Sequence, residues 1–282
     1  MENSKLPILV SFSGGRTSAF MTKYIKENYK DRDIVVVFSN TGKERFETLD
    51  FIERCDKEWD LGVVWVEPVI NHKFGEGVGF NIVNYETASR NGEPFEEMIK
   101  KYGIPNKPAP MCTDKLKATP IRKYMLSLGY KKWYTAIGIR YDEHHRVNWE
   151  RAKKTNYVYP LITDFRVDKK FIREWWDKQC FDLNLKDYEG NCDMCWKKSQ
   201  RKLMTIITEQ PNLIQWWDKM EKQYGVENEE TFFRNNQSAQ DLISLSKFPF
   251  KKAIDEHELD KNQFKMFDSE LDIEYDCFCK SS

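Results

Sequence analysis

A pair of glycines within a run of hydroxyl side chains is the first feature of this sequence that could do chemistry. Residues 11–18 are Ser-Phe-Ser-Gly-Gly-Arg-Thr-Ser. Glycines let the backbone turn sharply, so that amide N–H groups and the start of a following helix face an anion. Hydroxyl and guanidinium groups add donors suited to phosphate. The candidate phosphate-binding residues are Ser11, Ser13, Gly14, Gly15, Arg16, Thr17 and Ser18.

This run lacks the Gly-Lys-Ser/Thr ending of a Walker A loop, which disfavours a kinase-like or GTPase-like phosphate site. An ordinary glycine-rich turn capped by serine is the simpler alternative. Two further polar segments follow predicted strands, where α/β folds place their ligands. Thr41-Gly42 lets the backbone approach a ribose or base, and Arg140 and Arg146 suit phosphate or sulfate. Solvated loop charge is the plainer interpretation of either arginine alone.

The cysteines form a second group with possible chemistry. Cys192-Asp193-Met194-Cys195 is a Cys-x-x-Cys turn followed by two lysines, and it offers two thiolates to one metal or cluster. A redox dithiol fits less well, since no thioredoxin-like βαβ unit adjoins it. Spacing does not separate iron-sulfur from zinc. Cys55, on an amphipathic helix, and Cys180, beside two tryptophans, are interpreted as packing residues.

Apolar strands alternating with amphipathic helices must position these residues. The β-α-β-α-β series predicts an α/β fold with a parallel sheet, right-handed crossovers and a ligand crevice at the carboxyl ends of the strands. The predicted strands cover residues 7–12, 34–38, 63–66 and 133–139, and the predicted helices cover residues 17–28, 46–59 and 116–128.

Residues 1–165 are predicted to form the nucleotide-binding α/β domain, with an insertion or long active-site loop at about 69–110 that contains a helix near 94–102. Residues 166–282 are predicted to form a helical C-terminal portion that ends in a charged tail from residue 251. Its helices are predicted at 170–178, 199–209 and 213–224. The pairs Trp175-Trp176 and Trp216-Trp217 could stack on bases, but a core position is favoured.

Composition sets bounds without identifying a partner. The 282 residues include 45 basic and 45 acidic side chains, so no global positive field argues for nucleic acid. No window approaches the twenty apolar residues that span a bilayer, and the polar start is unlike a signal peptide. We therefore expect a cytoplasmic enzyme whose cysteines stay reduced, with no membrane partner. A homodimer is compatible with the sequence.

The motif Ser13-Gly14-Gly15-x-x-Ser18 resembles the signature of the PP-loop ATP pyrophosphatases, which belong to the adenine nucleotide alpha-hydrolase superfamily. Residues 38–44 and 138–146 resemble segments of its phosphoadenosine-phosphosulfate reductase branch, and the correspondence runs from about residue 7 to 198. The resemblance implies a Rossmann-like, HUP-type sheet flanked by helices, whose loop grips pyrophosphate. The resemblance places the adenosine near residues 38–44. It also implies that an arginine and an acidic residue from residues 138–146 frame the nucleotide. The residues it adds are Asn40, Gly138 and Asp142.

Cys112 lies in a stretch, residues 110–120, that resembles the cysteine-lysine stretch of the iron-sulfur assimilatory reductases, which pair it with a distant Cys-x-x-Cys. Those reductases usually carry a tandem cysteine pair where this chain has Met111-Cys112. The resemblance implies Cys112, Cys192 and Cys195 as ligands of a 4Fe-4S cluster, with zinc as the alternative. The fourth ligand is open, and Cys277 or Cys279 of the tail could supply it. Three cysteines with one free iron would resemble the iron-sulfur-dependent transfer-RNA thiolases.

The resemblance implies an enzyme that uses ATP and Mg²⁺ to adenylate a substrate oxygen, releases pyrophosphate and transfers sulfur, with a nucleic-acid base as a reasonable acceptor and an unidentified sulfur donor. The residues assigned to catalysis are Arg16, Ser18, Arg140, Asp142 and Arg146. One alternative is a phosphoadenosine-phosphosulfate reductase, in which a thiol of the tail attacks sulfur and sulfite leaves, with a reductant still to be identified. Another alternative is a nucleotide sensor or zinc-stabilised binding module without turnover.

Overall fold

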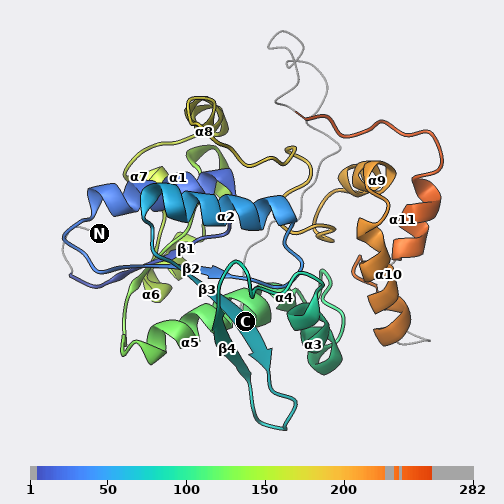
Figure 1. Cartoon of the computed structure of the whole chain (residues 1–282), viewed down its shortest axis with the longest axis horizontal. Coiled ribbons are helices and arrows are strands. Elements are labelled where there is room, and N and C mark those ends of the chain that lie inside the picture. Colours follow the sequence, from blue (N-terminus) through green and yellow to red (C-terminus); the bar gives the residue numbers. More distant parts are fainter. Residues whose placement is uncertain (1–4, 226–231, 235–236, 256–282) are drawn as a thin grey trace.

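The computed structural model describes residues 5–225, 232–234 and 237–255, and within them the chain forms a six-stranded sheet (Figure 1). The strand order is β4-β3-β2-β1-β5-β6, and all neighbouring pairs are parallel except β3 and β4. The strands are β1 (Ile8–Ser11), β2 (Ile34–Ser39), β3 (Val63–Ile70), β4 (Val78–Val83), β5 (Tyr134–Ala136) and β6 (Tyr157–Val158).

The predicted α/β class with a parallel core sheet is confirmed, but the predicted insertion at 69–110 contributes an antiparallel edge strand that the sequence analysis missed. Residues 71–77 between β3 and β4 suffice for a hairpin, whereas a parallel neighbour needs a long crossover. The helix predicted near 94–102 within the same insertion is confirmed as α3 (Glu93–Tyr102).

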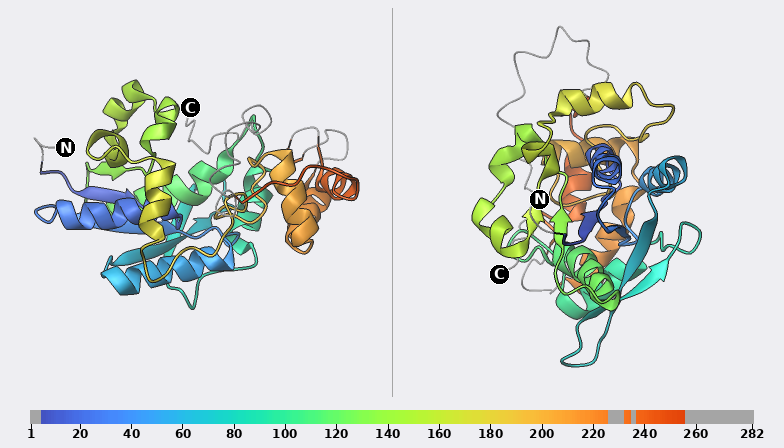
Figure 2. Two further views of the ribbon diagram at one scale, coloured as in Figure 1. Left: turned by 90° about the horizontal axis from the view of Figure 1, so that it is seen from above. Right: turned by 90° about the vertical axis from the view of Figure 1, so that its left-hand side faces the viewer.

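Helices cover both faces of the sheet because alternate strand residues are apolar on each side. Ile8 and Val10 of β1 join the cluster formed with α1 and α2, while Leu9 packs with Met125 of α5 on the opposite face. Figures 1 and 2 show α1 and α2 on one side and α5 on the other. These helices are α1 (Arg16–Asn28), α2 (Phe46–Trp59) and α5 (Thr119–Ser127).

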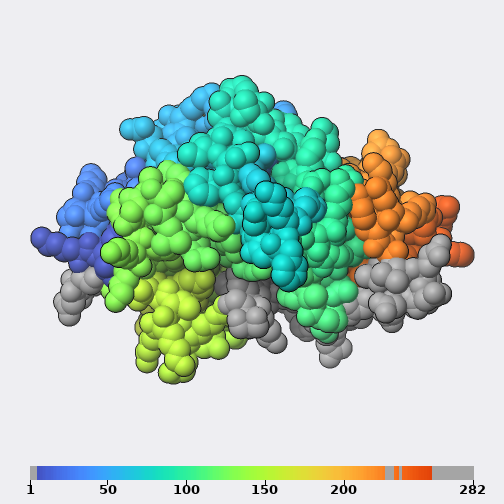
Figure 3. All heavy atoms as spheres, turned by 90° about the horizontal axis from the view of Figure 1, so that it is seen from below, coloured from blue at the N-terminus to red at the C-terminus, as the bar shows by residue number. Residues whose placement is uncertain are grey.

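Two large hydrophobic clusters organise the chain. The first joins the sheet to residues 167–185, including Trp176 at the end of α8 (Lys169–Trp176). The second joins α3 to the C-terminal helices, which lie together at one end of the molecule in Figure 3. Those helices are α9 (Gln200–Glu209), α10 (Leu213–Tyr224) and α11 (Ala239–Leu245). The division at residue 165 stays a prediction, since the clusters group residues 167–185 with the sheet.

The remaining short helices connect these layers. They are α4 (Met111–Thr113), the π-helix η1 (Asp114–Ala118), the 3₁₀ helix η2 (Tyr141–Arg146), α6 (Trp149–Thr155) and α7 (Pro160–Thr163). None of the helices in the described ranges is long and apolar enough to cross a bilayer.

The side chains predicted to pack in the core differ in their exposure. Trp176 and Trp217 are buried, which confirms their core positions, and Cys55 is fully buried in α2, as expected. Cys180 is exposed, so its interpretation as a packing residue is wrong. The helix that carries the two neighbouring tryptophans ends at Trp176, and the chain after it no longer follows the helical periodicity on which the interpretation rested.

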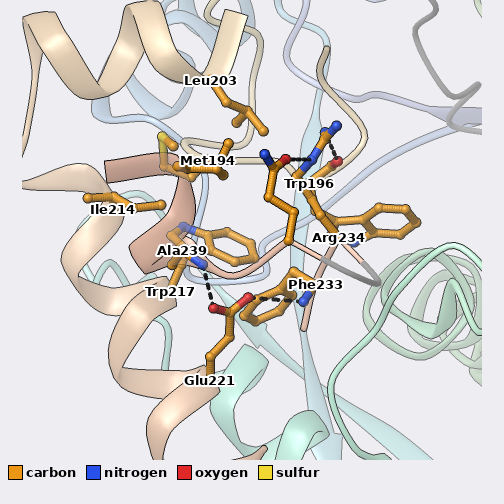
Figure 4. Close-up of a pocket in the computed structure, with 11 residues that line it drawn as sticks. Met194, Trp196, Leu203, Ile214, Trp217, Glu221, Phe233, Arg234 and Ala239 are labelled. Carbon is orange, nitrogen blue, oxygen red and sulfur yellow. Dashed lines mark hydrogen bonds between the residues drawn. The ribbon is translucent and has the colours of Figure 1, made fainter. Parts of the chain in front are cut away.

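A small cavity of about 20 Å³ lies in the second cluster between α9, α10 and α11 (Figure 4). Glu221 lines it and accepts hydrogen bonds from the backbone N–H groups of Ala239 (2.6 Å) and Phe233 (3.0 Å). Burial raises the pKa of Glu221 to about 7, against the opposing effect of these two hydrogen bonds. The cavity could hold about one water molecule and is far too small for a nucleotide.

Candidate functional site

The phosphate loop, residues 13–18, connects β1 to α1 at the carboxyl edge of the sheet. Gly14 has a φ of 76°, and a Cβ atom there would lie 2.6 Å from Cγ2 of Thr48 and 2.7 Å from Cδ1 of Ile52. Gly15 is the N-cap of α1, and no side chain caps that helix. The first N–H groups of a helix have no intrahelical acceptor. They are therefore available to an anion, and their contact with phosphate stays a prediction.

Three contacts hold the loop in shape. The backbone N–H of Ser13 donates to Oγ of the buried Ser18 at 2.9 Å. The indole N–H of Trp176 donates to the carbonyl of Arg16 at 3.1 Å. The side-chain amide of Asn191, from a segment far along the chain, donates to the carbonyl of Ser13 at 2.8 Å. The hydroxyl of Ser18 thus serves the loop itself in this structure.

Arg16 points toward a partner within the protein. Its Nε and Nη2 atoms each lie 2.7 Å from a carboxylate oxygen of Asp182, and the guanidinium also donates to the carbonyls of Leu183 and Leu185. The predicted contact of Arg16 with phosphate stays a prediction. The observed contacts make the side chain a clamp between the start of α1 and residues 182–185.

Residues 138–146 do meet the phosphate loop. A Cβ atom on Gly138 would lie 3.5 Å from Cα of Ser18, and Nη1 of Arg140 lies 3.5 Å from Oγ1 of Thr17. Arg140 also forms an ion pair with Asp142, with 3.0 Å between Nε and Oδ1. The structure therefore brings a guanidinium to the open first turn of α1, beside the proposed phosphate position.

Arg146 belongs to the same group of charges, because Glu143 pairs with both Arg146 and Arg140. Glu143 also forms the capping box of η2, since its side chain accepts from the backbone N–H of Arg140. Asp142 and Arg146 thus lie on η2, and Arg140, which contacts Thr17 of α1, is the N-cap residue of that helix.

The segment after β2 is buried. Asn40 and Thr41 are at most 2% exposed. The amide of Asn40 donates to Glu67 and to the carbonyl of Ser89, and its Oδ1 accepts from the N–H of Gly42. These polar groups form hydrogen bonds within the protein, and direct nucleotide contact by residues 40–42 stays a prediction.

The thiol turn, residues 190–198, lies against this segment. The backbones of Glu44 and Cys192 form an antiparallel bridge, and the N–H of Asp193 donates to the carbonyl of Lys43 at 3.0 Å. Nζ of Lys43 lies 2.7 Å from Oδ2 of Asp193, with both side chains at most 9% exposed. The indole N–H of Trp217 donates to the other carboxylate oxygen at 2.9 Å. A buried ion pair therefore fixes the turn to the end of β2.

A second buried ion pair extends this connection, since Nη2 of Arg45 lies 2.9 Å from Oε1 of Glu189. Nζ of Lys117, on η1, lies 3.3 Å from Oε1 of Glu44. These pairings were not predicted from the sequence. The signal available was the run Lys43-Glu44-Arg45 in the loop that follows the apolar strand β2, where charge is expected either to be solvated or to have partners.

The thiols can be tested against the implied cluster. Cys112 and Cys192 both border the second hydrophobic cluster, and Lys117, on the π-helix that follows Cys112, acts electrostatically on Cys192. Burial raises the pKa of the Cys192 thiol, with Asp193 and Glu44 adding to the effect. A bound metal would have to replace the thiol protons. By donor type, Cys112, Cys192 and Cys195 suit a soft metal or cluster.

The geometry of such a site is not assembled: within residues 5–225, 232–234 and 237–255, no three His, Cys, Asp or Glu side chains are grouped closely enough to hold a metal ion. The predicted fourth ligand Cys277, like Cys279, lies outside the described residues. The iron-sulfur cluster therefore stays a proposal that rests on the type of the donors and on the place of Cys112 and Cys192 beside the second hydrophobic cluster.

The chain is similar to known proteins over most of its length. A family model described as the phosphoadenosine phosphosulfate reductase domain matches residues 7–163. An uncharacterized nin region protein of Escherichia phage lambda is 35% identical over 200 residues, 69% of this chain and 67% of that protein. An uncharacterized protein of Methanocaldococcus jannaschii is 26% identical over 237 residues, and the match covers 81% of this chain but 51% of that longer protein.

Two solved structures are also similar. One is a phosphoadenylyl-sulfate (PAPS) reductase from Candida auris in a phosphate complex, with a TM-score of 0.38 and 14% identity over 65% of this chain and 76% of that chain. The other is the U34-tRNA thiolase NcsA from Methanococcus maripaludis with its 4Fe-4S cluster, with a TM-score of 0.38 and 12% identity over 87% of this chain and 72% of that chain. At such TM-scores neither similarity carries an argument about function.

Proposed function

The chain belongs to the phosphoadenosine phosphosulfate reductase domain family, and from this premise we propose that it is an ATP-dependent enzyme that adenylates an acceptor oxygen, releases pyrophosphate and transfers sulfur. The observation that supports the proposal most is the phosphate loop. It combines a glycine at positive φ, an uncapped first helical turn and a guanidinium beside that turn.

In the proposed reaction an oxygen of the acceptor attacks the α-phosphorus of ATP, and the bond to the bridging oxygen breaks, so that pyrophosphate leaves with the electron pair. A sulfide-level sulfur nucleophile then attacks the activated carbon and AMP leaves. The N–H groups at the start of α1 and the guanidinium of Arg140 would stabilise the charge that develops on pyrophosphate, and Mg²⁺, when bound, would supply further positive charge there. Asp142 and Glu143 hold the guanidinium of Arg140 in place.

Cys112, Cys192 and Cys195 would hold the proposed 4Fe-4S cluster, which when bound supplies a soft site for sulfur. The buried ion pairs around Lys43 and Arg45 connect the turn that carries two of these thiols to the end of β2. A nucleic-acid base is the proposed acceptor class. The support for this acceptor is the resemblance of the three-cysteine set in the sequence to the iron-sulfur-dependent transfer-RNA thiolases, and not a feature of the described surface.

The family match itself favours a second candidate, which is the reduction of phosphoadenosine phosphosulfate by a thiol. In that reaction a cysteine sulfur attacks the sulfate sulfur, the nucleotide leaves, and a second thiol releases sulfite. The proposed nucleophile, Cys277 or Cys279, lies outside the described residues. The two candidates share the nucleotide site and differ in product.

We expect anaerobically purified protein with ATP, Mg²⁺, sulfide and unfractionated transfer RNA to release pyrophosphate. Gly14→Ala should abolish this release and weaken ATP binding at least a hundredfold, because a Cβ atom at Gly14 would overlap two buried side chains and the residue would be strained at positive φ. The measurements are calorimetry and a coupled pyrophosphate assay.

Gly62→Ala is the matched control. Gly62 also has a positive φ, of 66°, but a Cβ atom there would meet no other atom within 4 Å. It should lose about 1–2 kcal/mol of stability and keep ATP affinity. If the protein forms sulfite from phosphoadenosine phosphosulfate and dithiothreitol and releases no pyrophosphate from ATP, the transferase proposal is wrong and the reductase candidate takes its place. Unchanged ATP affinity in folded Gly14→Ala protein would remove the phosphate-loop assignment.

A further inference from the structure

We propose that Asn191 is a positioning residue of the phosphate loop, which fixes the peptide between Ser13 and Gly14 so that the Gly14 N–H points at the anion. The inference deepens the proposed function and rests on its phosphate site. Nothing in the sequence singled out this residue except that it precedes the first cysteine of the thiol turn.

The contacts of Asn191 place it directly on the loop. Its Nδ2 donates to the Ser13 carbonyl at 2.8 Å, and a Cβ atom on Gly15 would lie 3.2 Å from the same nitrogen. Its own carbonyl accepts from the N–H of Arg45 at 2.8 Å. Asn191 is therefore held by the N-cap residue of α2 and in turn holds the loop, although it lies 178 residues from Ser13 in the sequence.

The effect on the loop follows from peptide geometry. The described residues contain no cis peptide bond, so the carbonyl of Ser13 and the N–H of Gly14 point in opposite directions across one plane. Fixing the carbonyl on Asn191 directs the Gly14 N–H away from Asn191. It also keeps a carbonyl oxygen, which would repel phosphate, out of the anion position.

The loop needs this external contact because its own residues leave that peptide plane undetermined. The N–H of Ser13 is already fixed on Ser18, but the peptide that follows joins a serine to a glycine at positive φ, and glycine adopts either sign of φ readily. A rotation of this one peptide would exchange a donor for an acceptor at the anion position. The amide of Asn191 prevents that exchange.

The experiment compares ligands that carry phosphate with one that does not. By calorimetry, Asn191→Ala should raise the Kd of ATP and of inorganic pyrophosphate about tenfold and leave the Kd of adenosine unchanged. Asn191→Asp has nearly the same shape, cannot donate to the Ser13 carbonyl when ionised and brings negative charge near the phosphates. It should raise both Kd values about a hundredfold. Asn184→Ala, an exposed position in the segment before the turn, is the control and should change none of them.

A selective loss of phosphate ligands in both Asn191 variants supports the inference, whereas equal losses for ATP and adenosine, or no loss, overturn it. If the wild-type protein binds pyrophosphate in an Asn191-dependent way but ATP is not turned over, the positioning role stands and the adenylation proposal fails. If ATP is turned over and both Asn191 variants keep wild-type affinities, the adenylation proposal stands and the positioning role of Asn191 fails. Wild-type protein that binds no phosphate ligand overturns both.

Discussion

The phosphate loop and the thiol turn lie next to each other but use their polar groups in opposite ways. The loop leaves the first N–H groups of α1 without a side-chain cap, and its two glycines add no side chain of their own. The thiol turn directs its charge inward, with Asp193 paired to Lys43 and bonded to Trp217, all nearly buried. Backbone N–H groups without an acceptor suit an exchanging ligand, whereas a closed network of ion pairs stabilises one conformation. We therefore propose ligand binding for the loop and a supporting role for the charged residues of the turn, beside the metal-binding role proposed for its cysteines.

The largest expected change in the free energy of unfolding comes from breaking the buried ion pair of the thiol turn. Asp193→Ala would leave the ammonium of Lys43 buried without its carboxylate and remove the acceptor of the Trp217 indole. Breaking one partner of a buried pair costs about 3–5 kcal/mol. We expect that loss in the free energy of unfolding, measured by urea denaturation. The lysine also lies 4.7 Å from the ring of Trp216, which would retain part of its stabilisation.

Glu58→Ala is the control, since Glu58 pairs with Arg54 at an exposed i,i+4 position of α2. Its loss should be at most about 0.5 kcal/mol. A similar small loss for Asp193→Ala would mean that the turn is as solvated as the surface, and the contrast between the two regions would disappear.

The sequence predicted the loop well and the turn poorly, and the reason is physical. The phosphate loop depends on local features, namely an apolar strand, two glycines and a helix, all within residues 7–28. The helix α2, with its regular apolar spacing, was predicted over its observed residues. The partners of Lys43 and Arg45 lie more than 140 residues away, at Asp193 and Glu189, and no local pattern contains that information.

The same distinction explains the partial outcome for the nucleotide residues. Arg140 was placed at a strand end and does meet the first turn of α1. Asn40 was assigned to the nucleotide by resemblance, but its side-chain amide donates to Glu67 of β3 and to Ser89, which lies in the part of the chain predicted to be an insertion. Position at the end of a strand was predictable, whereas the direction of a buried side chain depends on neighbours that only the fold supplies.

A change of intermediate size is expected in the pH dependence of stability, through Glu221 beside the thiol turn. Glu221 lines the same cavity as Met194 and Trp196 of the thiol turn, and burial raises its pKa to about 7. Because the folded state binds this proton more tightly than the unfolded state does, stability should fall as the pH rises from about 4.5 to about 7. The shift corresponds to at most about 3 kcal/mol.

Urea denaturation between pH 5 and pH 8 measures this slope, with Glu221→Gln as the matched variant. The glutamine cannot titrate, so its stability should lack the descending component, although its amide satisfies the N–H groups of Phe233 and Ala239 less well. An equal slope in both proteins would assign the dependence to other groups and show that Glu221 is ionised without penalty.

The smallest expected change concerns Arg16, whose guanidinium either stabilises the fold through Asp182 or binds phosphate directly. In the structure the guanidinium is held by Asp182, and the two side chains are 19% and 30% exposed. As a clamp, the pair should contribute about 1–2 kcal/mol. Arg16→Gln and Asp182→Ala should then each lower the free energy of unfolding by about that amount, and the double variant should lose little more than either, because one interaction is removed in all three. ATP affinity should change less than threefold in either single variant.

A direct contact between Arg16 and phosphate, as predicted from the sequence, would give a different pattern. Arg16→Gln would weaken ATP binding tenfold or more, and Asp182→Ala would preserve or strengthen ATP binding by releasing the guanidinium. Calorimetry on the two single variants decides between these outcomes. The second pattern would extend the open region by one side chain and leave Asp182 as a counter-ion that the nucleotide displaces.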